Sequence, residues 1–189
     1  IFHGKLRLYS KKYNVDLSRW VARIARIKKA KLLILPAYFN TGPILEHATL
    51  SQKRYIKRYF ENVNSPSIFS IQNISLTLNL PILISSYLEK AGAHYYISSL
   101  FIESDGNIYG RYRKIVLSKY ESPYGIKRGK ELTIFNTRFG VKIGVAINKE
   151  IWYPEIYRAY KIKGANLFIT PLNPLNYNYY MVSIAARSR

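Results

Sequence analysis

Short apolar runs and amphipathic stretches follow one another along this sequence, and that order limits its possible folds more than any other feature. The run "KLLILP" (31–36) has the length and composition of a buried strand. Before it, apolar residues recur at spacings of three and four, which predicts a helix over 17–29 with Trp20 and Ile27 on its apolar face and Asp16 as its cap. Strands and helices in this alternation favour a layered α/β fold.

The same reasoning assigns elements to the rest of the chain. The stretch "SDGN" (104–107) predicts an Asp-Gly hairpin turn, and a second hairpin turns near Gly140. In "GVAINKEIWYPE" (144–155), a buried strand breaks at a turn, and Pro154 then begins a helix that ends at Gly164. The remaining predictions are strands over 5–10, 81–88, 93–103, 108–116 and 166–171, a helix over 67–79 and a loop over 118–130.

The charge of the chain points to a polyanionic partner. It has 30 Lys and Arg residues against 10 Asp and Glu, a formal net charge of +20. Such an excess repels itself in a compact fold and attracts polyanions, so nucleic acid is the expected partner, with a generically basic surface as the alternative. Arg and Lys suit phosphate groups, and the tyrosines between them can stack on unpaired bases. The predicted RNA-binding residues are Arg19, Arg23, Arg26, Lys28, Lys29, Lys53, Arg54, Lys57, Arg58, Arg111, Arg113, Lys127, Arg128 and Lys130.

Other chemistries are less consistent with the composition. The chain has no cysteine, which excludes disulfides, thiolate catalysis and Cys-based zinc sites. His3, His47 and His94 are too scattered to predict a metal site, and we expect neither a metal nor a cofactor. No apolar run reaches the ~18 residues of a membrane span, and no signal-peptide pattern occurs, so we expect no membrane contact and a cytoplasmic location. The scarcity of Cys and Met is typical of a thermophile.

Four stretches, taken in order, resemble the nitrilase superfamily of carbon–nitrogen hydrolases. They are "LLILPAYFNTG" (32–42), "SDGNIYGRYRKIVL" (104–117), "FGVKIGVAINKEIWYPE" (139–155) and "RAYKIKGANLFITP" (158–171). The resemblance implies one domain over 1–189 with a nitrilase-like αββα sandwich. Because the fold of that family continues further, we expect the sandwich to be incomplete at its C-terminal end and the sequence to be the ordered part of a longer chain.

The resemblance also implies where a catalytic triad should lie. In that family a Cys attacks a nitrile or amide carbon, a Glu is the general base, and a Lys stabilises the tetrahedral intermediate. Matched position by position, Lys114 is retained, but Ala37 stands at the Glu position and Asn148 at the Cys position. Neither side chain can do that chemistry, so we predict that the chain is not an enzyme. Activation of a water beside Lys114 by Glu121 or Glu150 is the alternative.

The leading hypothesis is therefore a non-catalytic, nitrilase-like pseudoenzyme that binds structured RNA. It predicts a structural component of a ribosomal subunit in a thermophilic archaeon, with ribosomal RNA and neighbouring ribosomal proteins as partners. Two alternatives stay open: an amidase-like carbon–nitrogen hydrolase with an atypical site around Lys114, and an inactive structural subunit of a hydrolase complex. The resemblance also allows a homo- or hetero-oligomer through a nitrilase-like interface.

Overall fold

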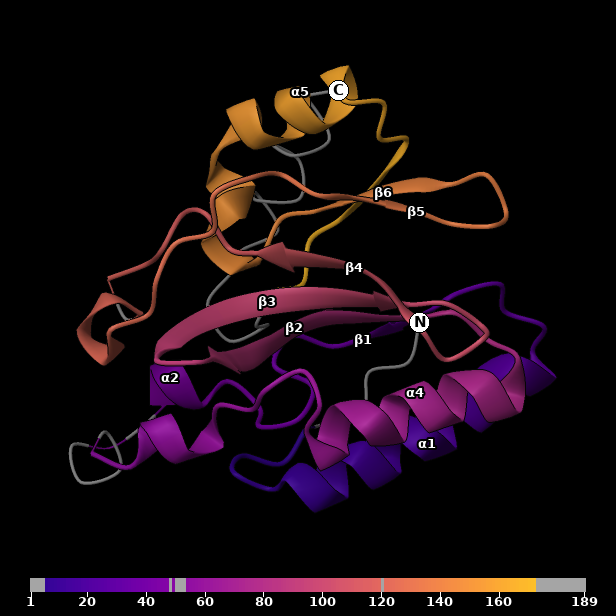
Figure 1. The fold of residues 1–189 in the computed structure, drawn as a ribbon, viewed down its shortest axis with the longest axis horizontal. Coiled ribbons are helices and arrows are strands. Elements are labelled where there is room, and N and C mark those ends of the chain that lie inside the picture. The colour runs from indigo at the N-terminus through magenta and orange to yellow at the C-terminus, as the bar shows by residue number, and fades with distance from the viewer. Residues whose placement is uncertain (1–5, 48, 50–53, 120, 173–189) are drawn as a thin grey trace.

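Two sheets lie face to face between outer layers of helices (Figure 1). The computed structural model describes residues 6–47, 49, 54–119 and 121–172. One sheet has the strand order β1-β2-β3-β4 and the other β5-β6-β7. The strands are β1 (Leu33–Leu35), β2 (Ile82–Ala91), β3 (His94–Ile102), β4 (Ile108–Arg113), β5 (Ile134–Asn136), β6 (Lys142–Val145) and β7 (Leu167–Ile169). This arrangement confirms the predicted α/β class and the αββα sandwich.

Three antiparallel strand pairs lie between two parallel pairs along the chain. Strand β1 pairs with β2 in parallel, whereas β2–β3 and β3–β4 are antiparallel hairpins. In the second sheet, β5–β6 is a hairpin and β6–β7 is parallel. Both predicted hairpin turns are confirmed, with Gly106 at φ 78° and Gly140 at φ 82°, a backbone conformation that glycine adopts without strain.

The helices cover the two outer faces of the sandwich. Helices α1 (Lys11–Ile27) and α4 (Pro66–Leu78) lie against the four-stranded sheet, and α5 (Pro154–Ile162) lies against the three-stranded sheet (Figure 1). The sequence marks the ends of α4 clearly, because the Ser65 hydroxyl accepts a hydrogen bond from the Ile68 N–H and Asn79 ends the helix in the left-handed conformation. Short helical segments are α2 (Ile44–His47), η1 (Ile56–Tyr59), η2 (Ser122–Tyr124) and η3 (Asn148–Trp152).

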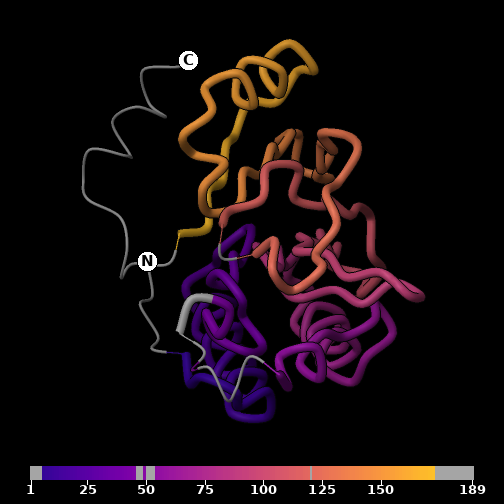
Figure 2. Tube along the Cα trace, turned by 90° about the vertical axis from the view of Figure 1, so that its left-hand side faces the viewer, coloured from indigo at the N-terminus to yellow at the C-terminus, as the bar shows by residue number. Residues whose placement is uncertain are grey.

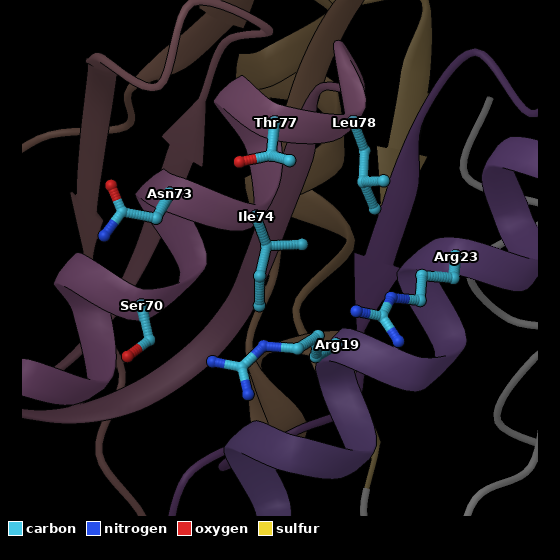
Figure 3. Close-up of a pocket in the computed structure, with 7 residues that line it drawn as sticks. All are labelled: Arg19, Arg23, Ser70, Asn73, Ile74, Thr77 and Leu78. Atoms are coloured by element: carbon cyan, nitrogen blue, oxygen red, sulfur yellow. The ribbon is translucent and has the colours of Figure 1, made fainter.

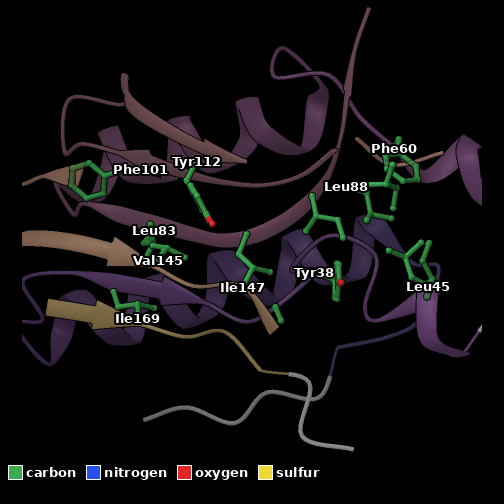
Figure 4. Close-up of a cluster of buried hydrophobic side chains, with 14 of the residues drawn as sticks. Tyr38, Leu45, Phe60, Leu83, Leu88, Phe101, Tyr112, Val145, Ile147 and Ile169 are labelled. Atoms are coloured by element: carbon green, nitrogen blue, oxygen red, sulfur yellow. The ribbon is translucent and has the colours of Figure 1, made fainter. Parts of the chain in front are cut away.

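Three apolar clusters match the three interfaces between these layers. Apolar side chains from both sheets, among them Leu83, Phe101, Val145 and Ile169, fill the space between the sheets (Figure 4). The chain trace seen from the side shows the same separation of the two halves of the sandwich (Figure 2). A second cluster joins α1 and α4 to the four-stranded sheet, and a third joins α5 to the other sheet. A Cβ atom at Gly110 of β4 would lie 2.6 Å from the Phe135 ring, so the sheets approach closely there.

The N-terminal predictions need correction. Residues 6–10 form no strand; a turn covers residues 8 and 9, and α1 begins at Lys11, so that Asp16 lies inside the helix instead of capping it. The side chain of Asn14 explains the early start, because its Oδ1 accepts from the Arg7 N–H and its Nδ2 donates to the Arg7 and Asn40 carbonyls. Because its side chain is satisfied by these bonds, the polar Asn14 can be fully buried.

The predicted apolar face of α1 is also wrong in part. Trp20 is 52% exposed and Ile27 is 76% exposed. The buried face consists instead of small and polar residues, Asn14, Val15, Ser18 and Ala22. Small residues allow α1 to pack closely against its neighbours in the core, and the larger Trp20 and Ile27 side chains stay exposed.

Candidate active site

The turn after β6 has the geometry that the resemblance predicted for a nucleophile position. Asn148 follows the buried run of β6 and adopts φ 50°, in the left-handed region. Asparagine is one of the few residues other than glycine that enter this region readily. The Asn148 N–H donates to the Pro171 carbonyl at 3.1 Å, which fixes the turn against the segment that follows β7. The turn therefore holds one side chain at the carboxyl end of a central strand.

The side chain of Asn148 lies in the interior and is only partly satisfied. Its Nδ2 donates to the Tyr38 hydroxyl at 2.9 Å. Its Oδ1 is buried and accepts no hydrogen bond from the described residues. Buried acceptors of this kind are uncommon and call for a partner. Tyr38 comes directly after the buried Ala37, and its side chain lies in the apolar cluster between the sheets (Figure 4).

A buried ion pair completes this group. Lys114 follows β4, is fully buried, and donates from Nζ to Glu121 Oε1 at 2.6 Å. The Tyr38 hydroxyl donates to the same Glu121 oxygen at 3.5 Å, and the Ser118 N–H donates to Glu121 Oε2 at 2.6 Å. A buried charge is stable only when it is paired and hydrogen-bonded, and both conditions hold here. Tyr38 thus links Asn148 to the Lys114–Glu121 pair.

A second carboxylate beside the turn has a different role. Oxygen Oε1 of Glu150 accepts from the Tyr112 hydroxyl and from the N–H groups of Ile115 and Val116, and Oε2 accepts from the Ile147 N–H. Burial raises the pKa of Glu150, against the lowering effect of these hydrogen bonds. With four donors around it, Glu150 fixes the backbone after β4 and before the Asn148 turn. It positions the site, and three of its four donors come from the backbone.

The structure brings the three predicted triad positions into one place. Ala37 follows β1 and Lys114 follows β4 of the four-stranded sheet, whereas Asn148 follows β6 of the other sheet. Ala37 belongs to the apolar cluster between the two sheets, as does Ile147, directly before Asn148. Sequence reasoning missed Tyr38, whose hydroxyl makes the connection. Its position directly after Ala37 was visible in the sequence, but the direction of its side chain was not.

Six of the predicted RNA-binding residues line two separate pockets. Arg111, Arg113, Arg128 and Lys130 line one pocket. Arg19 and Arg23 of α1 line another, together with Ser70, Asn73 and Thr77 of α4 (Figure 3). The others on described residues lie outside both pockets: Arg26, Lys28, Lys29, Arg54, Lys57, Arg58 and Lys127. Lys53 lies outside the described residues.

The tyrosines near the "KRYIKR" segment are packed against cations of the same molecule. The segment was predicted as a helix with a cationic ridge, but its described part forms only the short η1. The Arg58 guanidinium lies 4.6 Å from the centre of the Tyr55 ring, and Lys57 Nζ lies 5.3 Å from that of Tyr95. These rings have cationic neighbours already, which leaves less of each face for stacking on a base.

Two kinds of feature were searched for within residues 6–47, 49, 54–119 and 121–172: a cluster of metal ligands and a membrane-crossing helix. No three His, Asp or Glu side chains in this part of the chain come together as a metal site needs. None of its helices combines the length and the apolar composition that a bilayer crossing demands. The cytoplasmic location predicted from the sequence stays a prediction.

Comparison with known proteins establishes the family. The sequence model described as carbon-nitrogen hydrolase matches residues 4–187. The chain therefore belongs to the carbon–nitrogen hydrolase family, as the four sequence stretches indicated. Among its relatives is the N-carbamoylputrescine amidase of Arabidopsis thaliana, 28% identical over 162 residues that make up 84% of this chain and 52% of the relative. The chain thus spans about half the length of the curated relatives it matches.

Other relatives and solved structures agree with this assignment. The citrullinase of Francisella tularensis is 32% identical over 94 residues, which cover 48% of this chain and 32% of that protein. A carbon–nitrogen hydrolase from Helicobacter pylori G27 superposes with a TM-score of 0.78 at 19% identity, covering 97% of this chain and 66% of that one. An amidase from Nesterenkonia sp. gives a TM-score of 0.70 at 18% identity, covering 90% of this chain and 62% of that one. At these identities the two structures show the shared fold alone.

These relatives overturn two predictions. The prediction that the chain is not an enzyme is wrong, since relatives named as amidases and a citrullinase place it in a family of enzymes. The classification as a ribosomal, RNA-binding pseudoenzyme is wrong for the same reason, and a thermophilic archaeal source has no support from them. Ala37 and Asn148 alter the site that such an enzyme uses without removing the chain from the family. The individual cationic residues and the RNA partner are untested and stay predictions.

Proposed function

We propose that the chain is an amidase-like carbon–nitrogen hydrolase with an atypical site formed by Lys114, Glu121 and Asn148. The proposal covers amide and carbamoyl groups, because the relatives cited above are named for reactions of that class. The observation that carries it is the buried Lys114–Glu121 pair, connected through Tyr38 to Asn148, whose Oδ1 lacks a partner among the described residues. The buried cation and the unsatisfied acceptor are both polar groups that can bind a substrate.

The two polar groups of the site complement an amide. An amide offers a carbonyl oxygen that accepts hydrogen bonds and a nitrogen that donates them. Lys114 Nζ carries three donors, of which Glu121 uses one, so another can bind the carbonyl oxygen on which negative charge develops during attack. Asn148 Oδ1 can accept from the amide N–H and so remove its own unsatisfied state.

In this proposal the attacking group is water, because residue 148 is an asparagine and the chain has no cysteine. A water adds to the carbonyl carbon, its proton passes to Glu121, and Glu121 returns the proton to the nitrogen as the C–N bond breaks. An amide and one water yield a carboxylic acid and ammonia. The proposal places that water beside Ala37, whose methyl group stands where the resemblance implies a Glu. Glu121 serves as the base because Glu150 is occupied by four donors.

The proposed reaction is slow compared with a thiol-dependent one. Without a nucleophilic side chain, the site keeps only orientation and charge stabilisation, and loss of such a catalytic unit typically lowers the rate by about 10⁴–10⁶-fold. We expect ammonia release from simple primary amides and N-carbamoyl amines that is measurable above the uncatalysed rate. The Lys114→Ala variant should lose this release, since the cation that meets the developing charge is gone.

The controls separate this site from a contaminant. The Lys127→Ala variant changes charge equally at an exposed position and should keep the wild-type rate. Ammonia release that is the same in wild type and Lys114→Ala would refute the proposed site. A wild type without release from any tested amide, carbamoyl compound or nitrile would refute the proposed activity.

A restoration experiment tests the geometry separately. The double variant Ala37→Glu/Asn148→Cys supplies the base and nucleophile that the resemblance implies, beside the retained Lys114. We expect amide turnover to rise by about 10²-fold or more over either single variant, because the two groups act as one unit. Gain in the double variant with no turnover in wild type would show a competent scaffold and disprove activity of the natural site.

A further inference from the structure

A basic pocket lies on the face of β4 opposite the candidate active site. Successive residues of a strand point to opposite faces, so Arg111 and Arg113 point away from the side that buries Tyr112. Together with the loop after η2, they enclose a cavity of about 230 Å³. Four cationic side chains line it, and Glu131 is the one acid among its lining residues on the described chain.

A buried carboxylate holds two of the cations in place. Glu89 of β2 is 1% exposed and accepts from Arg111 Nη1 at 2.9 Å and from Arg113 Nε and Nη2 at 2.8 Å each. Ser98 also donates to it. The Arg113 guanidinium lies 3.9 Å from the centre of the Tyr96 ring. Each guanidinium has five N–H donors, so both retain donors that Glu89 does not use.

The loop adds two more cations at a fixed position. The Gly129 N–H donates to the Lys114 carbonyl at 2.8 Å, and a Cβ at Gly129 would lie 2.0 Å from the Arg113 carbonyl oxygen. Only glycine allows this approach, which sets the flanking Arg128 and Lys130 beside the two strand arginines. Among the described residues, neither Arg128 nor Lys130 forms an ion pair. The pocket therefore keeps positive charge beyond what Glu89 and Glu131 offset.

We propose that this pocket binds the phosphoryl group of a small phosphorylated molecule. Arginine binds phosphate oxygens in a bidentate manner, and Glu89 holds two guanidinium groups at this pocket. A phosphoryl group carries about −1.5 to −2 charges at neutral pH, which suits the excess of cations better than a single carboxylate does. The cavity is smaller than the roughly 300–1,000 Å³ of sites for drug-sized ligands, so it favours a small ligand.

Calorimetric titration of the purified protein with inorganic phosphate and with pyrophosphate tests the proposal. Chloride at matched ionic strength in both solutions cancels general screening. We expect saturable binding of at least one of the two ions, and about tenfold or greater weakening in Arg128→Gln/Lys130→Gln, because charge-assisted hydrogen bonds are lost. Both residues are exposed, so the variant should fold; Arg113 variants are avoided because they leave Glu89 buried without its partner.

A matched variant distinguishes the pocket from overall charge. Arg26→Gln/Lys28→Gln removes the same two residue types at the exposed end of α1 and should bind phosphate as wild type does. Equal weakening in both double variants would show non-specific attraction and overturn the proposal. So would an absence of saturable binding, a preference for acetate over phosphate, or binding of an oligonucleotide without binding of either phosphate ion.

Discussion

Asn148 and Tyr38 both adopt left-handed backbone conformations, at φ 50° and φ 52°, on the two sides of one hydrogen bond. Such conformations cost free energy in residues other than glycine and persist only where the surroundings fix them. Here each turn aims a side chain at the same buried point between the sheets. The same conformation explains why asparagine is tolerated at residue 148, where a β-branched residue would be strained.

The ionised Glu89 side chain should stabilise the fold in a pH-dependent manner. Burial alone would raise the pKa of Glu89, but hydrogen bonds from Arg113 and Ser98 and the charges of both arginines lower it below its ordinary value. A lowered pKa means that the stabilising effect is present above the unfolded-state pKa of about 4.3 and is lost as the pH falls through the folded-state value. The Glu89→Gln variant should be about 2 kcal/mol less stable at pH 7.

Thermal unfolding of wild type and Glu89→Gln at pH 7, 5, 4 and 3 checks this. The gap between the two melting temperatures should narrow below about pH 4.3, because wild type then loses the ionised Glu89 as well. The conservative Glu89→Asp variant, which keeps the charge, should retain part of the pH dependence. A gap that is constant over this pH range contradicts the assignment.

At the scale of elements, β4 serves two sites with its two faces. Tyr112 points between the sheets and holds Glu150, while Arg111 and Arg113 point to the other face and hold Glu89. Because side chains alternate along a strand, a shift of one residue in the pairing of β4 would exchange these faces. The bulge in the β3–β4 pairing near Ile102 and the hairpin turn at Gly106 set the register that separates them.

The close contact between β4 and β5 should not tolerate a side chain at Gly110. A methyl group there would lie 2.6 Å from the Phe135 ring, in the contact between β4 and β5. The Gly110→Ala variant should therefore lose about 1–3 kcal/mol of unfolding free energy, because the two sheets are forced apart. Denaturant titration measures this loss. The double variant Gly110→Ala/Phe135→Leu should lose less than the sum of the two single variants; strict additivity would show that the two sites do not touch.

At the scale of the whole molecule, the net charge of +20 is the strongest feature left without an assigned partner. The six ion pairs among the described residues use five carboxylates, so most cations have none. Repulsion among the remaining cations destabilises the compact state. The cationic residues are distributed over both pockets and the loops, so this repulsion belongs to the molecule as a whole.

The salt dependence of stability follows from this charge. The Debye length falls from about 30 Å at 0.01 M to about 10 Å at 0.1 M salt, so sodium chloride should screen the repulsion and raise the melting temperature by several degrees. Calorimetric or fluorescence melting over this range measures the effect. The Lys28→Gln/Lys29→Gln variant should show a smaller rise, and a melting temperature that falls with salt would mean that attractive pairs dominate.

The sequence by itself determined the alternation of strands and helices and both hairpins, because these depend on local spacing and turn chemistry. The three positions Ala37, Lys114 and Asn148 came from its resemblance to a known family. Only the tertiary structure decided that Tyr38 contacts Asn148, 110 residues away, and that Glu89 fixes Arg111 and Arg113. It also rotated the buried face of α1 toward Asn14. Such contacts depend on how separate elements pack, and side-chain direction across that packing is not encoded in any short stretch of sequence.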